Sequence, residues 1–170
     1  MWEMDYGEAA EHWINKDKES VHMDSAALEE KIEDFIKANN TGALATASGD
    51  FVRCTPIEYN YIGGAFYLLS EGGLKFKALK DNKNVGFAIY EPYGGFANLK
   101  SLQVEGRADI IEPFSDEYMM VLEYKKIPES AIRKMPSPMN LIKITPVAYD
   151  YLDSNLKNEG YGVRQHLVKE

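Results

Sequence analysis

Two glycine-containing turns restrict the fold of this chain more than any other feature of its sequence. Gly49-Asp50 and Gly63-Gly64 each separate two short runs of small, β-branched and aromatic residues, a pattern typical of tight β-hairpins. Because strands joined by such short turns pair antiparallel, we expect an antiparallel sheet here. The three runs are GALATAS (42–48), FVRCTPIEYNYI (51–62) and AFYLLS (65–70).

Three later runs have the same strand-like character, and helical patterns lie mostly towards the ends of the chain. The runs are NVGFAIYE (84–91), SLQVEGRADIIE (101–112) and MNLIKITPVAYDYL (139–152). We expect helices over 5–20, from Asp24 or Ser25 to about 38, and from Ser115 to about Lys126. The pattern predicts a mainly β (α+β) fold: a six-stranded antiparallel barrel with flanking helices and one helical crossover.

The two N-terminal helical patterns differ in character. The first is polar nearly all round, with Trp13 and Ile14 as its only apolar anchors. The second has one apolar stripe at helical spacing, which predicts a helix packed on the core; the stripe is Leu28, Ile32, Phe35 and Ile36.

At 170 residues, and without internal repeats, the chain is expected to form one domain. We divide it into N-terminal helices over 1–40, a barrel over 41–152 and a polar C-terminal tail over 153–170.

Composition and charge exclude several classes of partner. The net charge of −8 and the lack of an arginine-rich arm argue against nucleic-acid binding. No apolar run approaches the roughly 20 residues that span a bilayer, and the acidic N-terminus is unlike a signal peptide. The single cysteine, Cys54, cannot form an internal disulfide, so we expect a reducing, cytoplasmic location.

No catalytic or metal-binding motif stands out. His12, His22 and His166 lie in the terminal regions, and none has a metal-ligand spacing to another His, Cys or Glu. We find no catalytic acid or base to assign and expect no metal site. Any chemistry is therefore expected to be carried by a bound cofactor.

The crossover SEGGLKFKALKDNKN (70–84) concentrates four lysines in an acidic chain. Gly72 and Gly73 would allow close backbone approach to a ligand and leave amide N–H groups free. Lys75 would occupy the first turn of a short helix, an unfavourable place for a cation unless an anion is bound there. The alternative is an amphipathic turn with a solvated lysine face, the interpretation we favour for Lys77, Lys80 and Lys83.

Polar residues on two strands are further candidates. Arg53, among apolar and small residues, either reaches solvent at a sheet edge or binds an anion. Pro56 indicates an edge strand or a bulge. Ser101 and Gln103 share one face of their strand, where solvent exposure is the alternative to ligand contact.

Taken in order, three segments carry a family resemblance: TGALATASGDFVRCTPIEY, FYLLSEGGLKFKALKDNKNV and SLQVEGRADI. Together they resemble the FMN-binding split-barrel family related to pyridoxamine 5′-phosphate oxidase, over residues 35–112 and more loosely over 139–150. The most specific element is Lys75 four residues before Leu79, followed by DNKNV and a strand containing VEG.

The resemblance implies a homodimer that binds FMN at its interface. It assigns the flavin phosphate to Arg53 and Lys75, and the surroundings of the isoalloxazine ring to Cys54, Thr55, Pro56 and Ile57. It adds Leu69 and Ser70 at the end of the third strand, with Ser101 and its neighbour Gln103 on the long strand.

The chain departs from the oxidase pattern at the substrate side. Leu74 and Ser101 stand where the oxidase has arginine and glutamine, and GYGVRQHL offers Arg164 and His166 in place of a tryptophan- and arginine-containing segment. The expected function is thus an FMN-dependent oxidoreductase whose substrate and electron donor stay open. The alternatives are a non-catalytic protein of this fold that binds haem (through His166 or His22), a deazaflavin or FMN, and a structural barrel dimer with an empty pocket.

Overall fold

The computed structural model describes residues 1 and 3–169. Its helices are α1 (Tyr6–Lys18), α2 (Ser25–Ala38), α3 (Lys75–Leu79), α4 (Asp116–Tyr124) and α5 (Glu129–Arg133), with 3₁₀ turns η1 (Phe96–Asn98) and η2 (Ser154–Glu159). Its strands are β1 (Thr41–Ser48), β2 (Phe51–Glu58), β3 (Asn60–Ile62), β4 (Ala65–Ser70), β5 (Asn84–Tyr90), β6 (Lys100–Ile111), β7 (Asn140–Asp153) and β8 (Arg164–Val168).

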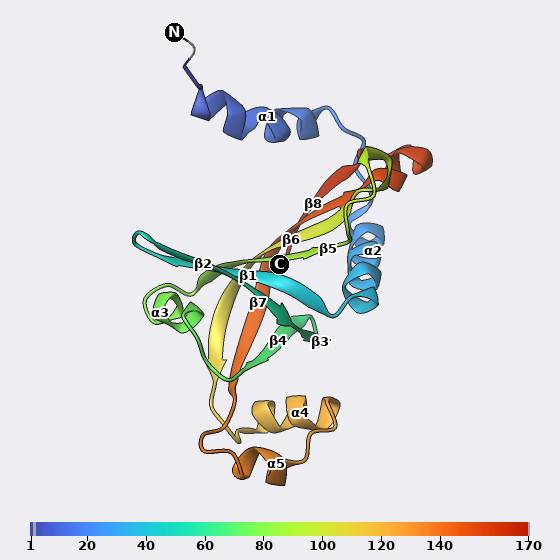
Figure 1. The fold of residues 1–170 in the computed structure, drawn as a ribbon. Coiled ribbons are helices and arrows are strands. Elements are labelled where there is room, and N and C mark those ends of the chain that lie inside the picture. The colour runs from blue at the N-terminus through green and yellow to red at the C-terminus, as the bar shows by residue number, and fades with distance from the viewer. Residues whose placement is uncertain (2, 170) are drawn as a thin grey trace.

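The strands form one antiparallel sheet that curls into a half-barrel (Figure 1). The order is β2-β1-β5-β6-β7-β4-β3, and β8 pairs with the C-terminal part of β7. This confirms the antiparallel barrel predicted from the hairpin pattern and the split-barrel type implied by the family resemblance. The sheet has eight strands in the described residues where we expected six, because the second run is divided into β2 and β3 and the C-terminal tail supplies β8.

The second run divides at Tyr59. Its side chain is buried in the barrel, its hydroxyl donates to the Ile36 carbonyl at 2.7 Å, and its amide donates to the Asn40 carbonyl at 2.8 Å. After this residue the chain leaves the β1 ladder and pairs with β4 as β3.

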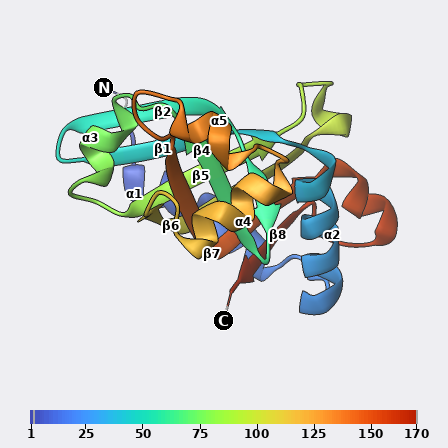
Figure 2. The ribbon, with the colours of Figure 1, turned by 90° about the horizontal axis from the view of Figure 1, so that it is seen from below.

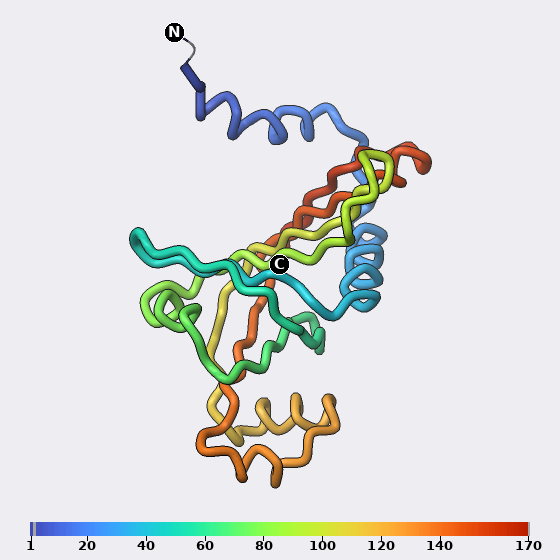
Figure 3. The backbone as a smooth tube through the Cα atoms, in the orientation of Figure 1, coloured from blue at the N-terminus to red at the C-terminus, as the bar shows by residue number. Residues whose placement is uncertain are grey.

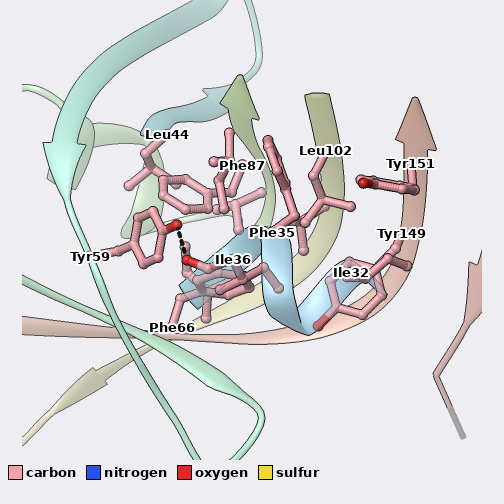
Figure 4. Close-up of a cluster of buried hydrophobic side chains, with 14 of the residues drawn as sticks. Ile32, Phe35, Ile36, Leu44, Tyr59, Phe66, Phe87, Leu102, Tyr149 and Tyr151 are labelled. Atoms are coloured by element: carbon pink, nitrogen blue, oxygen red, sulfur yellow. Dashed lines mark hydrogen bonds between the residues drawn. The ribbon is translucent and has the colours of Figure 1, made fainter. Parts of the chain in front are cut away.

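Helix α2 fills the concave side of the sheet with its apolar stripe (Figure 4). Ile32, Phe35 and Ile36 are each at most 2% exposed. Beneath them, the rings of Tyr59, Phe66 and Phe87 meet in edge-to-face contacts with centroids 5.3–5.5 Å apart, a favourable geometry for aromatic pairs.

A second, smaller core lies between α4, α5 and the ends of β4 and β7, where the two helices lie together at one end of the barrel (Figure 2). Strand β4 is buried on both faces: Phe66 and Leu68 belong to the barrel core, and Tyr67 packs in the second core. This explains why AFYLL is an uninterrupted apolar run rather than an alternating one.

Helix α1 extends away from the barrel (Figure 3). None of its residues is buried, as its polar sequence suggests, and about half of Trp13 and of Ile14 is exposed. Among the residues that the structure describes, no helix is both long enough and apolar enough to cross a membrane.

Candidate functional site

Lys75 is the most unusual charged residue of the crossover. It opens α3, separated by one residue from Gly72 and Gly73, whose φ angles of 154° and 111° favour glycine. The side chain is only 5% exposed, and its Nζ donates to the Gly72 carbonyl at 2.5 Å. Burial, and secondarily the nearby charge of Arg53, lower the pKa of Lys75 below its ordinary value.

Arg53 approaches Lys75 from the β1–β2 hairpin, on which α3 packs. In the β1–β2 ladder it pairs with Thr46, so the two residues share the face of the hairpin that α3 covers. Two residues earlier on the same face, the Phe51 ring lies 4.7 Å from Lys77 Nζ. This contact fixes α3 against the start of β2.

No carboxylate lies within 4.0 Å of the charged atoms of Arg53 or Lys75 in the described part of the chain. Buried cations are ordinarily paired with an acid, since an unpaired charge loses its hydration without compensation. Of the two cations only Lys75 is buried, whereas Arg53 is exposed. A bound anion would relieve both the repulsion between them and the lost hydration of Lys75. Arg53 and Lys75, named here the cation pair, therefore fit a phosphate group.

The other crossover lysines have ordinary surroundings. Lys80 is exposed, and Lys83 Nζ donates to the Leu79 carbonyl at 2.6 Å near the end of α3. Phe76 and Leu79 pack on the barrel core. Of the four lysines, only Lys75 is buried.

Ser70 shapes the loop before Lys75. It is 8% exposed, its Oγ donates to the Gly72 carbonyl at 3.0 Å, and it accepts from the Gly72 amide at 3.2 Å. The Gly72 amide is thus engaged, although we expected the amides there to be free. The neighbouring Leu69 is half-buried and packs against the second core.

The segment predicted to line a flavin ring alternates between the two faces of β2. Cys54 and Pro56 are exposed on the outer face, whereas Thr55 and Ile57 are half-buried towards the barrel interior. Within the described residues β2 pairs only with β1, which makes it an edge strand, as Pro56 indicated.

Ser101 and Gln103 lie on β6, away from the cation pair. The sheet register aligns Gln103 with Ala88, Ala43 and Pro56 on the outer face. Three strand intervals separate Gln103 from Pro56, roughly 14 Å across the sheet at the usual strand spacing. Ser101, half-buried, lies one step further along β6, opposite Tyr90. The fold of one chain thus brings Arg53 and Lys75 together but leaves Ser101 and Gln103 apart from them.

A cavity of about 480 Å³ lies between α1 and strands β6–β8, on the side of Gln103. The His166 Nδ1 lies 2.8 Å from Asp150 Oδ1, so the ring donates to this carboxylate and its Nε2 is left as the free nitrogen. The Arg164 guanidinium lies 4.2 Å from the centre of the Trp13 ring. Our sequence interpretation missed this cavity, because it treated 153–170 as a tail; the alternation of Arg164 and His166 was the available sign of a strand.

Comparisons with known proteins agree with this architecture. A family model described as pyridoxamine 5′-phosphate oxidase matches residues 28–153, well over half of the chain. No curated protein sequence matches this chain.

Solved structures share the fold at low sequence identity. ChuZ of Campylobacter jejuni has a TM-score of 0.65 and 18% identity, over 98% of this chain and 70% of that one. An FAD-binding protein of Mesorhizobium loti has a TM-score of 0.58 and 20% identity, over 71% and 89% of the two chains. HutZ, a haem storage protein of Vibrio cholerae, has a TM-score of 0.58 and 18% identity, over 70% and 89%.

These structural likenesses concern the fold alone, whereas the family match also covers the crossover, β2 and β6. The chain belongs to the pyridoxamine 5′-phosphate oxidase family.

Proposed function

We propose that this protein is an FMN-binding flavoprotein that acts as an oxidoreductase, with Arg53 and Lys75 holding the flavin phosphate. The observation that carries the proposal is the buried Lys75 beside Arg53 without a neighbouring acid. A phosphate bound there would accept charge-assisted hydrogen bonds from both side chains, which are stronger than bonds between neutral groups.

The remaining predicted residues would orient the ring. Arg53 lies on the α3 face of β2, whereas Cys54 and Pro56 lie on the opposite, outer face. The flavin would therefore pass across the edge of β2, where backbone and small side chains permit close approach of a flat molecule. Bound flavin would supply the hydride or electron chemistry, and the chain's own residues would bind and orient it. We assign no catalytic acid or base.

We further propose that the protein is a homodimer with FMN at the interface. Ser101 and Gln103 lie on the same outer face as Pro56 but three strand intervals away. A flavin bound at β2 of one chain would therefore reach Ser101 and Gln103 of a second copy more easily than those of its own chain. The face between them is lined by small residues, which allow another sheet to approach closely; these are Ala43, Ala45, Gly86 and Ala88.

The direct test is the chromophore that accompanies the purified protein. We expect FMN, identified by absorption spectrum and mass after release, or stoichiometric uptake of added FMN by the ligand-free protein. A colourless preparation that ignores FMN would overturn the proposal. Parallel titration with a deazaflavin separates the two isosteric cofactors, and binding of neither flavin nor haem would favour a structural role.

Haem binding is a second candidate, favoured by one observation at the 480 Å³ cavity. A histidine that ligates a metal commonly donates its other ring nitrogen to a carboxylate, as His166 does to Asp150. HutZ, of the same fold, is described as a haem storage protein. His22 is the weaker candidate, because its Nε2 already lies 3.0 Å from the Asp17 carbonyl.

Haem titration distinguishes the two candidates. If haem is the cofactor, a Soret band should form with the wild type and be lost in His166→Ala, whereas His22→Ala should retain it. An unchanged spectrum in His166→Ala would exclude His166 as the ligand.

A further inference from the structure

Thr46 is a polar residue that the predicted site did not include. It lies in β1, is 2% exposed, and its Oγ1 has no hydrogen-bond partner in the part of the chain that the structure describes. A buried hydroxyl without a partner has lost its bonds to water and gained none, so it calls for a physical explanation.

The sheet register places Thr46 directly beside the cation pair. Thr46 is the cross-strand partner of Arg53, and directly opposed side chains have Cβ atoms about 4.5–5.5 Å apart. On its other side Thr46 pairs with Val85, which is apolar and buried. Arg53 is thus the polar neighbour that the register gives Thr46, and α3, which begins with Lys75, packs on the same hairpin.

An apolar residue of the same shape would suit this position better if packing were its only requirement. Valine has the volume of threonine and leaves no buried hydroxyl, and it has high strand propensity. The threonine hydroxyl, by contrast, can donate a hydrogen bond to an anion. Neither the described residues around it nor solvent accepts such a bond at present.

We propose that the Thr46 hydroxyl is a third ligand of the phosphate held by Arg53 and Lys75. A rotation about χ1 would direct its O–H towards the anion, so that phosphate recognition combines two charged donors with one neutral donor. The inference rests on the proposed flavin function and refines it: the site selects a phosphorylated flavin over the same flavin without phosphate.

The test compares FMN with riboflavin in three variants. Thr46→Val should bind FMN about tenfold less tightly or worse, the size of one hydrogen bond to a charged group, with riboflavin binding unchanged. Thr46→Ser should restore FMN affinity to within a few-fold of wild type. Tyr149→Phe is the matched control, because it removes the other unpartnered buried hydroxyl at a position in β7; its FMN affinity should equal that of wild type.

The outcomes separate this inference from the function on which it rests. Wild-type protein that binds no flavin, or binds FMN and riboflavin equally, overturns the proposed phosphate site and this inference with it. If the wild type prefers FMN to riboflavin and Thr46→Val keeps this preference in full, only the Thr46 assignment is overturned. The Thr46 assignment is also overturned if Thr46→Val binds FMN and riboflavin more weakly by the same factor. The ratio of the two affinities within one variant cancels any general destabilisation of the binding site.

Discussion

Lys75 is buried beside Arg53, and the proximity of this second cation helps to lower the pKa of Lys75. One residue comes from the crossover helix and the other from an edge strand, so the contact depends on α3 packing on the β1–β2 hairpin. Folding thus brings together two like charges that a stable fold alone has no reason to join, and this is why we assign them to a ligand.

Removing either charge should weaken FMN binding. We expect Arg53→Ala and Lys75→Ala each to cost about 1–3 kcal/mol of FMN binding free energy, the range for a charge-assisted hydrogen bond. Lys80→Ala, which alters an exposed lysine of the same crossover, is the control and should bind as wild type does. Fluorescence titration measures all three, and wild-type affinity in the first two would refute the assignment.

The lowered pKa of Lys75 predicts how stability depends on pH in the ligand-free protein. With a folded pKa below its ordinary 10.5, Lys75 loses its proton at lower pH in the folded than in the unfolded chain. Between these two pKa values the unfolded state binds more protons, so the free energy of unfolding gains a contribution that rises with pH.

Lys75→Met isolates this contribution, because it keeps an unbranched side chain only one atom shorter and removes the titrating group. We expect Lys75→Met to be more stable than wild type at neutral pH, and the difference to shrink as pH approaches 10.5. Urea unfolding across this range tests it. Two stability curves that stay parallel would show that Lys75 titrates normally.

The parts of the fold that were predictable from sequence are those controlled by local chemistry. Gly49-Asp50 and Gly63-Gly64 sit in tight turns with positive φ at the glycines, and the apolar stripe of α2 lies in the core. Strand β8 was harder to predict. It pairs with β7, and the alternation of Arg164 and His166 is a weak signal in a short, polar segment.

The candidate site shows the same division. Lys75 was unusual by its place in the crossover, and the family resemblance joined it to Arg53. The separation of Gln103 from this pair follows from the order of strands across the sheet, a tertiary property that neighbouring residues do not encode. The Thr46 hydroxyl has no signature at all in sequence, because threonine is common in strands.

Removing the hydroxyl should change the stability of the protein differently at two buried tyrosines, Tyr59 and Tyr149 (Figure 4). Tyr59→Phe leaves the Ile36 carbonyl without its donor and should destabilise the protein by about 1–3 kcal/mol. Tyr149→Phe removes a hydroxyl that has no partner within residues 3–169, and should leave stability unchanged or raise it. Chemical denaturation compares them, and equal losses would contradict the assigned hydrogen bond.

The proposed dimer interface can be tested at Ala45, in the middle of the small-residue face. Ala45 pairs with Cys54 on one side and Gly86 on the other, and all three lie on the outer face of the sheet. If a second copy covers this face, Ala45→Arg would bury an unpaired charge in the interface, which costs several kcal/mol. We expect a monomer by light scattering, together with loss of FMN, since the interface would complete the flavin site.

Glu123→Arg is the control, because Glu123 is exposed on α4, remote from this face. It introduces the same side chain and should remain dimeric with FMN bound. A wild-type protein that is monomeric at micromolar concentration, or an Ala45→Arg variant that keeps both dimer and flavin, would reject this face as the interface. Monomeric Ala45→Arg that still binds FMN tightly would instead show that one chain suffices for the cofactor, and would remove Ser101 and Gln103 of a second copy from the site.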